Sequence, residues 1–131
     1  MATHTLNKQE RLCGLRLTEQ LFDRAGSRSV ASFPIRAVWR ETERHEGEPP
    51  VKVLMSVSKR HFKRAVKRNR VKRQLREAYR LNKQIIVEAV EQQSGRALMV
   101  GFVWLADELF PSEVVAEKIN KLLNRIAEKL L

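Results

Sequence analysis

Alternation of apolar and polar residues predicts two strands in the first half of the chain. Ser32–Arg40 and Val51–Ser58 each place apolar side chains at every second position, which is the period of a half-buried strand. Pro34 suggests an edge or a bulge in the first strand, because proline cannot donate a ladder hydrogen bond. Glu41–Pro50 holds four Glu, one Gly and two Pro, as expected of a connecting loop. We therefore predict that the two strands pair as a hairpin, in a register that so long a loop does not fix.

A helical period begins at about Ala65. The face predicted to pack on a sheet consists of Val71, Leu75, Ala78, Tyr79 and Asn82. The opposite face consists of Asn69, Arg73, Arg76 and Arg80. This helix is therefore expected to have one core side and one basic side.

Three further helices are predicted. Leu17–Phe22 forms a short first helix, with Thr18 as its N-cap, Leu17 and Phe22 as a hydrophobic staple, and Gly26 beyond its end. A second short helix contains Ile85, Ile86, Ala89 and Val90 and ends by Ser94 and Gly95. The last helix opens at Pro111, with Ser112 as its N-cap. Its predicted core stripe is Val115, Ile119, Leu122, Leu123, Ile126 and Leu130.

The run Ala97–Leu105 is nearly all apolar, as expected of a central strand that is covered on both faces. The predicted elements follow one another in the order αββααβα, without an internal repeat. This order predicts the α+β class.

Length and composition favour one folded domain, residues 1–131. A chain of 131 residues has the size of a single domain, and 43% hydrophobic with 31% charged residues is ordinary for a globular protein. The longest nearly uncharged run, Ala97–Ala106, is far shorter than the roughly 20 residues that cross a bilayer. The first 20 residues lack the apolar core of a signal peptide. We expect a cytoplasmic protein with no membrane partner, and its single Cys13 cannot form an internal disulfide.

The positive charge is confined to one segment. The formal net charge is +11, and Lys59–Lys83 contains twelve of the 26 basic residues but only one acid, Glu77. The rest of the chain is therefore neutral overall. A solvated surface helix is the alternative interpretation, but like charges one turn apart repel each other. We therefore favour binding of a polyanion, whose condensed counterions clustered Lys and Arg displace.

No catalytic set is recognisable. His4, His45 and His61 lack the spacing that would place two of them on one face as metal ligands. Cys13 has no evident base beside it and is interpreted as an inert thiol. The acidic pair Asp107 and Glu108 is more typical of the approach to a helix than of a metal site. The sequence predicts a binding protein whose chemistry, if any, is supplied elsewhere.

The middle third of the chain resembles the bacterial ribonuclease P protein family. The residues that carry the resemblance are Ser56, Val57, Ser58 and Lys59, then Ala65 and Val66, and then Arg68, Asn69, Arg70, Lys72 and Arg73. They match the family pattern of a strand ending in Ser-Val-Ser-Lys, a loop, and a helix that carries Arg-Asn-Arg-x-Lys-Arg. Outside this third, the resemblance covers most of the chain at the level of element order.

The resemblance implies a fold and a function. The fold is a single two-layer α/β sandwich in which the basic helix lies in a left-handed βαβ crossover, against the general preference for right-handed crossovers. The protein is expected to be a subunit of an endoribonuclease that removes the 5′ leader of precursor tRNA. Its expected partners are the catalytic RNA and the leader, with no protein partner evident. The catalytic RNA, using Mg²⁺, is expected to perform the cleavage.

The resemblance also implies site residues. RNA binding is carried over to the Arg-Asn-Arg region and extended along the helix and the preceding loop: Lys59, Arg60, Lys63, Arg64, Arg68, Asn69, Arg70, Lys72, Arg73, Arg76 and Arg80. The loop cations are expected to be flexible and to add to the binding without fixing its geometry. For Asn69, an RNA contact and a local backbone cap remain equal alternatives. Leader binding is carried over to Phe22 and Phe33, because aromatic faces stack on bases. Ordinary core packing is the alternative for both and the favoured one for Phe33.

Three positions depart from the family pattern. The loop after Lys59 is one residue longer and lacks the usual Gly, which leaves its path open. Thr18 stands where a further aromatic is expected, and Arg36 replaces an aromatic on the strand. We therefore expect Arg36 to contact the leader, with more electrostatic and less stacking character.

Two other classes remain as alternatives. A general basic ribosomal or structured-RNA-binding protein would show no preference for the leader and no role in cleavage. A protein-only nuclease or a DNA-binding module would act without the catalytic RNA. The lack of a recognisable metal or base set disfavours the nuclease, and the lack of a clear helix-turn-helix weakly disfavours DNA binding.

Overall fold

The computed structural model describes residues 21–22, 26–93 and 95–130. The elements are β1 (Arg28–Ser32), β2 (Ile35–Glu43), β3 (Val51–Ser56), α2 (Ala65–Asn82), α3 (Gln84–Glu91), β4 (Arg96–Trp104) and α4 (Ser112–Leu130). Most of the predicted first helix, including Leu17 and Thr18, lies outside the described residues. Leu21 is helical and Phe22 lies in a turn. Among the described residues, no helix is long and apolar enough to span a membrane.

The four strands form one mixed sheet in the order β1-β2-β4-β3. β2 pairs with β1 and with β4 in antiparallel fashion, whereas β3 runs parallel to β4. The predicted hairpin between Ser32–Arg40 and Val51–Ser58 is therefore wrong, because β4 lies between these two segments. Local alternation predicted β2 and β3, but β4, a strand from later in the chain, lies between them and prevents the expected pairing.

The predicted strand Ser32–Arg40 covers the last residue of β1, a turn and most of β2. β1 ends at Ser32, which pairs directly with Ile35 across a turn formed by Phe33 and Pro34. Phe33 continues the odd-numbered apolar series of β2 into the turn, so the pattern hid the reversal, although in β1 the even-numbered residues share the face of Ile35, Ala37 and Trp39. The predicted order αββααβα thus lacks β1.

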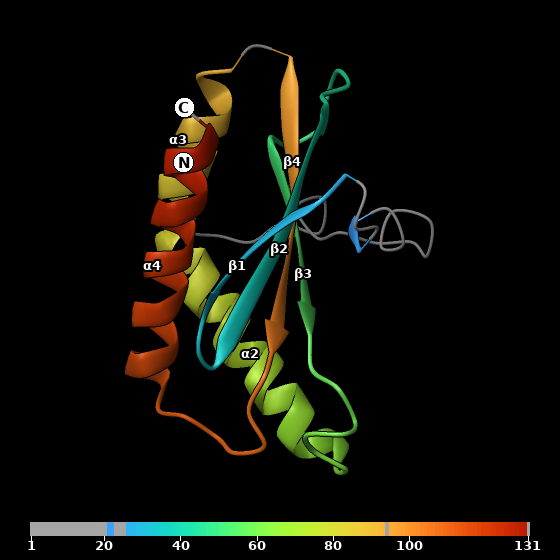
Figure 1. The fold of residues 1–131 in the computed structure, drawn as a ribbon, viewed down its shortest axis with the longest axis vertical. Helices are drawn as coiled ribbons and strands as arrows, with labels where there is room; N and C mark the ends of the chain where they lie inside the picture. Colours follow the sequence, from blue (N-terminus) through green and yellow to red (C-terminus); the bar gives the residue numbers. More distant parts are fainter. Residues whose placement is uncertain (1–20, 23–25, 94, 131) are drawn as a thin grey trace.

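All three described helices cover the same side of the sheet (Figure 1). Every second residue of each strand faces these helices. The predicted core stripe of α4 is buried in full against these strand residues. Trp39, Phe102 and Trp104 are the largest strand residues in this core. Burial of these faces is what fixes the α+β sandwich, as predicted.

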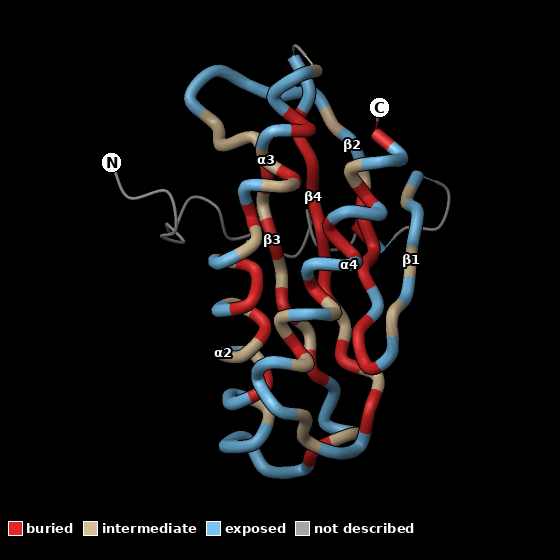
Figure 2. Tube along the Cα trace, turned by 90° about the vertical axis from the view of Figure 1, so that its left-hand side faces the viewer, coloured by how far each residue is buried: buried red, intermediate tan, exposed pale blue. Residues whose placement is uncertain are grey.

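The connection from β3 to β4 through α2 and α3 is a left-handed crossover. Both strands run downward in Figure 1. With the helices toward the viewer, β3 lies to the left of β4 and α2 lies in front of the sheet (Figure 2). This confirms the handedness that the family resemblance implied.

The helix boundaries agree closely with the periodicity. α2 begins at Ala65 and buries Val71, Leu75, Ala78 and Tyr79, and α3 ends at Glu91, before Gly95. At α4, the Pro111 carbonyl accepts the first helical hydrogen bonds and Ser112 is the first helical residue. The predicted N-cap is therefore displaced by one residue, within the usual uncertainty of a helix end.

Candidate nucleic-acid interface

The basic segment Lys59–Lys83 comprises a loop and one helix. The loop between β3 and α2 carries Lys59, Arg60, Lys63 and Arg64, and all four side chains are exposed. On α2, Asn69, Arg70 and Arg73 are exposed, whereas Arg68, Lys72, Arg76 and Arg80 are partly buried. The structure therefore places the predicted RNA-binding residues on one loop and on the helix that follows it.

The loop is more ordered than the sequence suggested. The backbone amides of His61 and Phe62 donate to the Ser58 carbonyl, and the Phe62 ring is buried in the core. Arg68 Nη1 donates to the carbonyls of Phe62 and Lys63, each at 2.8 Å. The loop cations are thus presented on a fixed backbone, and Arg68 has a clear role in positioning that backbone.

Two contacts join this loop and α2 to the segment between β4 and α4. His61 Nδ1 lies 2.6 Å from Asp107 Oδ1. Gln74 Nε2 donates to the Phe110 carbonyl at 3.0 Å and to Ser112 Oγ at 3.1 Å. β3 and β4 are parallel, so the segments that follow them leave the sheet at the same edge. No sequence signal pointed to these contacts, because their partners are at least 36 residues apart.

The single acid of the basic segment is paired. Arg80 Nε donates to Glu77 Oε2 at 3.1 Å, and Arg80 Nη2 bonds the other carboxylate oxygen. The hydrogen bond from Arg80 lowers the pKa of Glu77, and the same bond raises the pKa of Arg80. Glu77 is therefore a carboxylate at neutral pH and partly offsets the positive charge at this end of the helix.

A cleft lies on the sheet face opposite the helices, and we call it the sheet cleft. It has a volume of about 520 Å³ and is lined by Phe22, Ser27, Arg28, Ser29, Arg36, Val38 and Val103. Phe22 and Arg36, which were both predicted to bind a leader, thus lie in one cavity. The Phe22 side chain is 41% exposed and is available for stacking.

Phe33 has a different environment from the one predicted. It lies in the β1–β2 turn, is 60% exposed and meets Phe110 edge-on, with ring centroids 6.1 Å apart. Core packing, the favoured interpretation, is therefore wrong for Phe33. Phe33 is not one of the described residues that line the sheet cleft, because the turn places its ring beyond the end of the strand.

Comparison with known proteins identifies the family. The family model described as Ribonuclease P matches residues 6–126. The ribonuclease P protein component of Porphyromonas gingivalis is 38% identical over 127 residues, covering 96% of this chain and 89% of that protein. The chain belongs to the ribonuclease P protein family. The protein component of Chlorobaculum tepidum is 38% identical over 89 residues, covering 60% of this chain and 58% of that protein.

A solved member of the family has the same fold. The ribonuclease P protein from Thermotoga maritima matches with a TM-score of 0.67 at 22% identity, covering 88% of this chain and 96% of that chain. Family membership assigns the chain to RNA binding and tRNA processing, as the protein component of an endoribonuclease complex with an RNA partner. The predicted family and the predicted role as the protein subunit of ribonuclease P are confirmed, and the general RNA-binding alternative is not favoured.

We assign no metal site to the described part of the chain. Within residues 26–93 and 95–130, no group of three or more His, Cys, Asp or Glu side chains could hold a metal ion. Asp107, suggested as part of an acidic pair, is engaged with His61.

Gly101 is a position of close approach beside the sheet cleft that the sequence analysis missed. It lies at the centre of β4, between Val38 of β2 and Leu54 of β3. A Cβ at Gly101 would fall 2.9 Å from Leu21 Cδ2 and 3.4 Å from Phe22 Cζ. The lone Gly in an otherwise apolar strand was the available signal, because such a glycine often marks a close approach. Here the absence of a side chain at Gly101 leaves room for Phe22 at the sheet cleft.

Proposed function

We propose that the basic segment binds the catalytic RNA of ribonuclease P and that the sheet cleft binds the single-stranded 5′ leader of precursor tRNA. The observation that carries this proposal is the separation of the two surfaces. The basic segment lies on the loop and helix of the crossover, and the sheet cleft lies on the other face of the sheet. One protein could therefore hold both RNAs at once.

The basic segment suits a structured RNA. Its arginines are fixed on a helix, and a guanidinium can bind two phosphate oxygens at once. The loop cations lie on a backbone that Arg68 and the buried Phe62 hold in place. Such a surface binds phosphates in a defined geometry, as assembly with one particular RNA requires.

The sheet cleft suits a single strand. Phe22 offers an aromatic face for a base, and Arg36 and Arg28 offer cations for the phosphates. Base stacking on an aromatic ring contributes roughly 1–3 kcal/mol. Because Arg36 stands where the family pattern has an aromatic, we expect a steeper salt dependence of leader binding in this protein.

In this proposal the RNA subunit performs the hydrolysis. Mg²⁺ bound by that RNA would stabilise the negative charge that develops on the oxygens around phosphorus. The residues of this chain bind and orient the two RNAs. Their contribution is therefore to affinity and to the position of the cleavage site.

Cleavage of precursor tRNA by the cognate catalytic RNA at low Mg²⁺ tests the proposal. We expect cleavage at the mature 5′ end to rise sharply when the protein is added, and the protein alone to cut nothing. A protein that binds RNA but leaves this cleavage unchanged would support the general RNA-binding alternative. Cleavage by the protein alone would place the chemistry in the chain itself.

Arg36→Ala tests the cleft within the same assay. We expect weaker binding of precursor tRNA that carries a leader, a flatter salt dependence, and unchanged binding of mature tRNA. Unchanged leader affinity and salt slope in this variant would remove Arg36 from the proposed site.

A further inference from the structure

Three connections meet at one edge of the sheet. Ile35, the first residue of β2, pairs with Trp104, the last residue of β4. Ser56, the last residue of β3, pairs with Val103 of β4. The β1–β2 turn, the basic loop and the segment between β4 and α4 therefore lie together at the lower end of Figure 1. We call this end the lower edge, and it comprises residues 33–34, 57–64 and 105–111.

The lower edge carries two aromatic rings, Phe33 and Phe110, which we call the aromatic pair. Phe110 lies edge-on to the fully buried Trp104, with ring centroids 5.6 Å apart, and Phe33 lies edge-on to Phe110. The Pro34 carbonyl accepts a 2.8 Å hydrogen bond from the Leu105 amide, which ties the turn to the end of β4. The structure therefore fixes the Phe33 ring in place and leaves 60% of the residue exposed.

The turn itself gives no reason for a Phe at this position. Gly, Asn, Asp, Ser and Pro are the residues that favour turns, and each does so through its backbone or a short polar side chain. A large aromatic ring that is exposed in a turn stabilises the fold little, because burial is the source of its stabilising effect. The position of Phe33 is therefore typical of a residue that contacts another molecule.

Cations of α2 lie next to the aromatic pair. Gln74 Nε2 donates to the Phe110 carbonyl at 3.0 Å. Arg70 and Lys67 precede Gln74 by four and seven residues, so they share its side of α2, and both are exposed. Arg70 is one helical turn, about 6 Å along the axis, from the residue that contacts Phe110. The aromatic pair therefore borders the basic segment.

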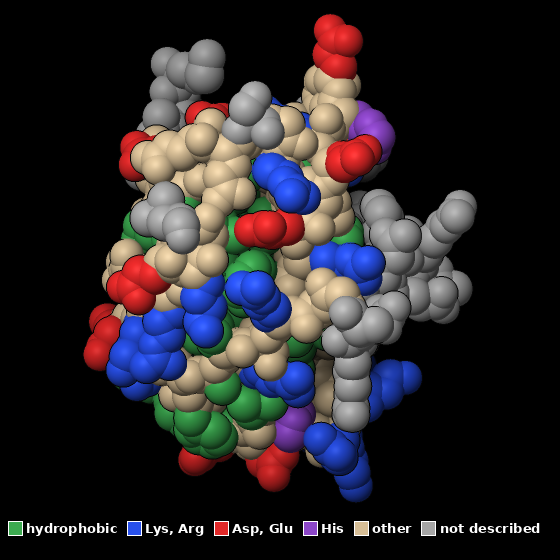
Figure 3. Space-filling model, turned by 45° about the horizontal axis from the view of Figure 1, so that its top comes forward, with side chains coloured by type: hydrophobic (Ala, Val, Ile, Leu, Met, Phe, Trp, Pro, Cys, Tyr) green, Lys and Arg blue, Asp and Glu red, His purple; other side chains and the backbone are tan. Residues whose placement is uncertain are grey.

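The charges at the lower edge favour an uncharged group at the aromatic pair and phosphates beside it. Figure 3 shows hydrophobic side chains at the lower end of the molecule, beside a His, with Lys and Arg further to the right and acidic side chains below. Glu108 precedes Phe110 and Glu113 follows it, and both are exposed. These acids disfavour a phosphate at the rings themselves. A nucleobase is uncharged and stacks on an aromatic ring, while nearby cations bind its phosphates.

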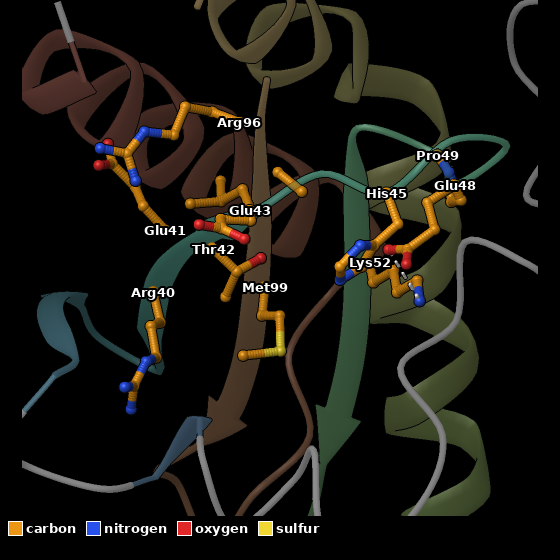
Figure 4. Close-up of a pocket in the computed structure, with 12 residues that line it drawn as sticks. Arg40, Glu41, Thr42, Glu43, His45, Glu48, Pro49, Lys52, Arg96 and Met99 are labelled. Atoms are coloured by element: carbon orange, nitrogen blue, oxygen red, sulfur yellow. Dashed lines mark ion pairs between the residues drawn. The ribbon is translucent and has the colours of Figure 1, made fainter. Parts of the chain in front are cut away.

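The opposite end of the sheet offers no comparable surface. It carries a pocket of about 530 Å³, and none of the exposed large hydrophobic residues in the described part of the chain lines it. The charged Glu, Lys and Arg residues of its lining balance: Glu41, Glu43 and Glu48 against Arg40, Lys52 and Arg96. Figure 4 shows Glu48 paired with Lys52, at 3.6 Å. A contact with RNA that combines stacking and positive charge is therefore expected at the lower edge.

We propose that Phe33 stacks on an unpaired base of the catalytic RNA and that Arg70 and Lys67 bind the adjoining phosphates. This inference rests on the proposed binding of the catalytic RNA by the basic segment. It assigns Phe33 to the catalytic RNA rather than to the leader. Proteins recognise RNA mostly at loops and bulges, where a base can leave its own helix and stack on a side chain. Every base has a flat face, so the contact selects an unpaired position more than a base type.

Assembly of the protein with its cognate catalytic RNA tests the proposal. We expect Phe33→Ala to weaken binding about tenfold, as for the loss of one stacked base. Phe33→Leu should show most of this loss, because Leu has no flat face, and Phe33→Tyr should bind as the unmodified protein does. The salt slope should stay unchanged in all three variants, because stacking releases no counterions. Arg70→Gln, in contrast, should flatten the slope by about 0.7–0.9.

Phe22→Ala is the matched control, because it also removes an exposed aromatic ring. We expect Phe22→Ala to act mainly on the affinity for precursor tRNA that carries a leader, and Phe33→Ala mainly on assembly with the catalytic RNA. Ultraviolet cross-linking of the unmodified complex, mapped by mass spectrometry, should join the peptide that contains Phe33 to the catalytic RNA. A structural effect of Phe33 alone would give no such cross-link.

Each contrary result separates the stacking contact from the proposed function. Unchanged assembly of Phe33→Ala, or a cross-link from Phe33 to the leader, would overturn the contact and leave RNA binding by the basic segment intact. Reduced self-association of Phe33→Ala with unchanged RNA affinity would also overturn it and make the aromatic pair a protein contact. If the unmodified protein does not bind the catalytic RNA, the proposed function itself fails. Should Phe33→Ala unfold at a lower temperature, the comparison of Phe33→Leu with Phe33→Tyr decides the outcome.

Discussion

His61 Nδ1 lies 2.6 Å from Asp107 Oδ1, and this contact joins the loop after β3 to the segment after β4. The His61 side chain is 11% exposed, whereas the Asp107 side chain is 82% exposed. The largely buried imidazole thus anchors the basic loop, and the carboxylate contacts it from the surface. We infer that this pair helps to keep the loop cations in the position that the catalytic RNA meets.

Asp107→Ala tests that relationship, with the neighbouring Glu108→Ala as control. Both changes remove one negative charge, so simple electrostatics predicts slightly tighter RNA binding for both. We expect Asp107→Ala alone to weaken assembly with the catalytic RNA and to accelerate amide exchange in residues 58–64. The loss of stability should stay below about 1 kcal/mol, because the carboxylate is exposed. Parallel behaviour of the two variants would show that the contact does not position the loop.

Charge reversal on the helix distinguishes a specific surface from diffuse charge. Arg70→Glu or Arg73→Glu should weaken assembly with the catalytic RNA far more than Lys118→Glu on α4. The reason is that the first two residues lie in the basic segment on α2, whereas Lys118 lies on another helix. Filter-binding titrations over a range of salt concentrations provide the measurement. Equal losses for all three variants would mean that only the total charge matters.

Arg68 should behave differently from its neighbours. Its Nη1 donates to two loop carbonyls, so Arg68→Ala leaves both without this partner. We expect a loss of unfolding free energy of about 1–3 kcal/mol from this variant. Arg73→Ala should leave stability unchanged and flatten the salt slope of RNA binding by about 0.7–0.9. Thermal unfolding and salt titration of both variants would detect the contrast, and a stable Arg68→Ala would contradict it.

Gly101→Ala should disturb the sheet cleft and spare the basic segment. The added Cβ would press on Leu21, which is fully buried, and on Phe22. Overpacking of this kind typically costs about 1–3 kcal/mol. We expect weaker leader binding with unchanged affinity for the catalytic RNA. Combining Gly101→Ala with Leu21→Ala should cost less than the sum of the single changes, because the two side chains compete for one space. Full additivity would argue against the contact.

Glu77→Gln should strengthen RNA binding. The carboxylate faces Arg80 and is the only acid in the basic segment. The hydrogen bond from Arg80 lowers the pKa of Glu77, so any stability the pair contributes is present above the ordinary carboxyl pKa and is lost as the pH falls through the lowered value. The advantage of the Gln variant in RNA affinity should therefore be constant around neutral pH and shrink only in acid. An advantage that varies near neutrality would point to a different titrating group.

The sequence predicted local structure where one period dominated a segment. α2, α3 and α4 each show an unbroken helical stripe, and the buried residues of α4 are those of the predicted stripe. The central strand β4 was predicted from its continuous apolar run, since both of its faces are covered. These predictions succeeded because burial on one face or on both leaves a direct trace in the order of residues.

The errors arose because the hydrophobic period does not indicate where the chain reverses or which strands pair. The apolar series of β2 continues through Phe33 into the turn, so the chain reversal at Phe33 and Pro34 was not recognised and β1 was missed. The pairing of β2 with β3 was inferred from their nearness in sequence, but β4 lies between them. The candidate site shows the same limit, because the position of Phe33 depended on that turn.

The sequence by itself determined that this protein binds a polyanion and which family it resembles, because net charge and motif are properties of the residue order. Only the tertiary structure decided which cations share a surface and which hold the loop in place. His61 and Asp107 are 46 residues apart, and they meet only because β3 and β4 run parallel and end at one edge of the sheet. Phe22 and Arg36 meet at the sheet cleft because Gly101 lets Leu21 and Phe22 approach β4. Contacts of this kind depend on how distant segments pack, and no local pattern encodes that packing.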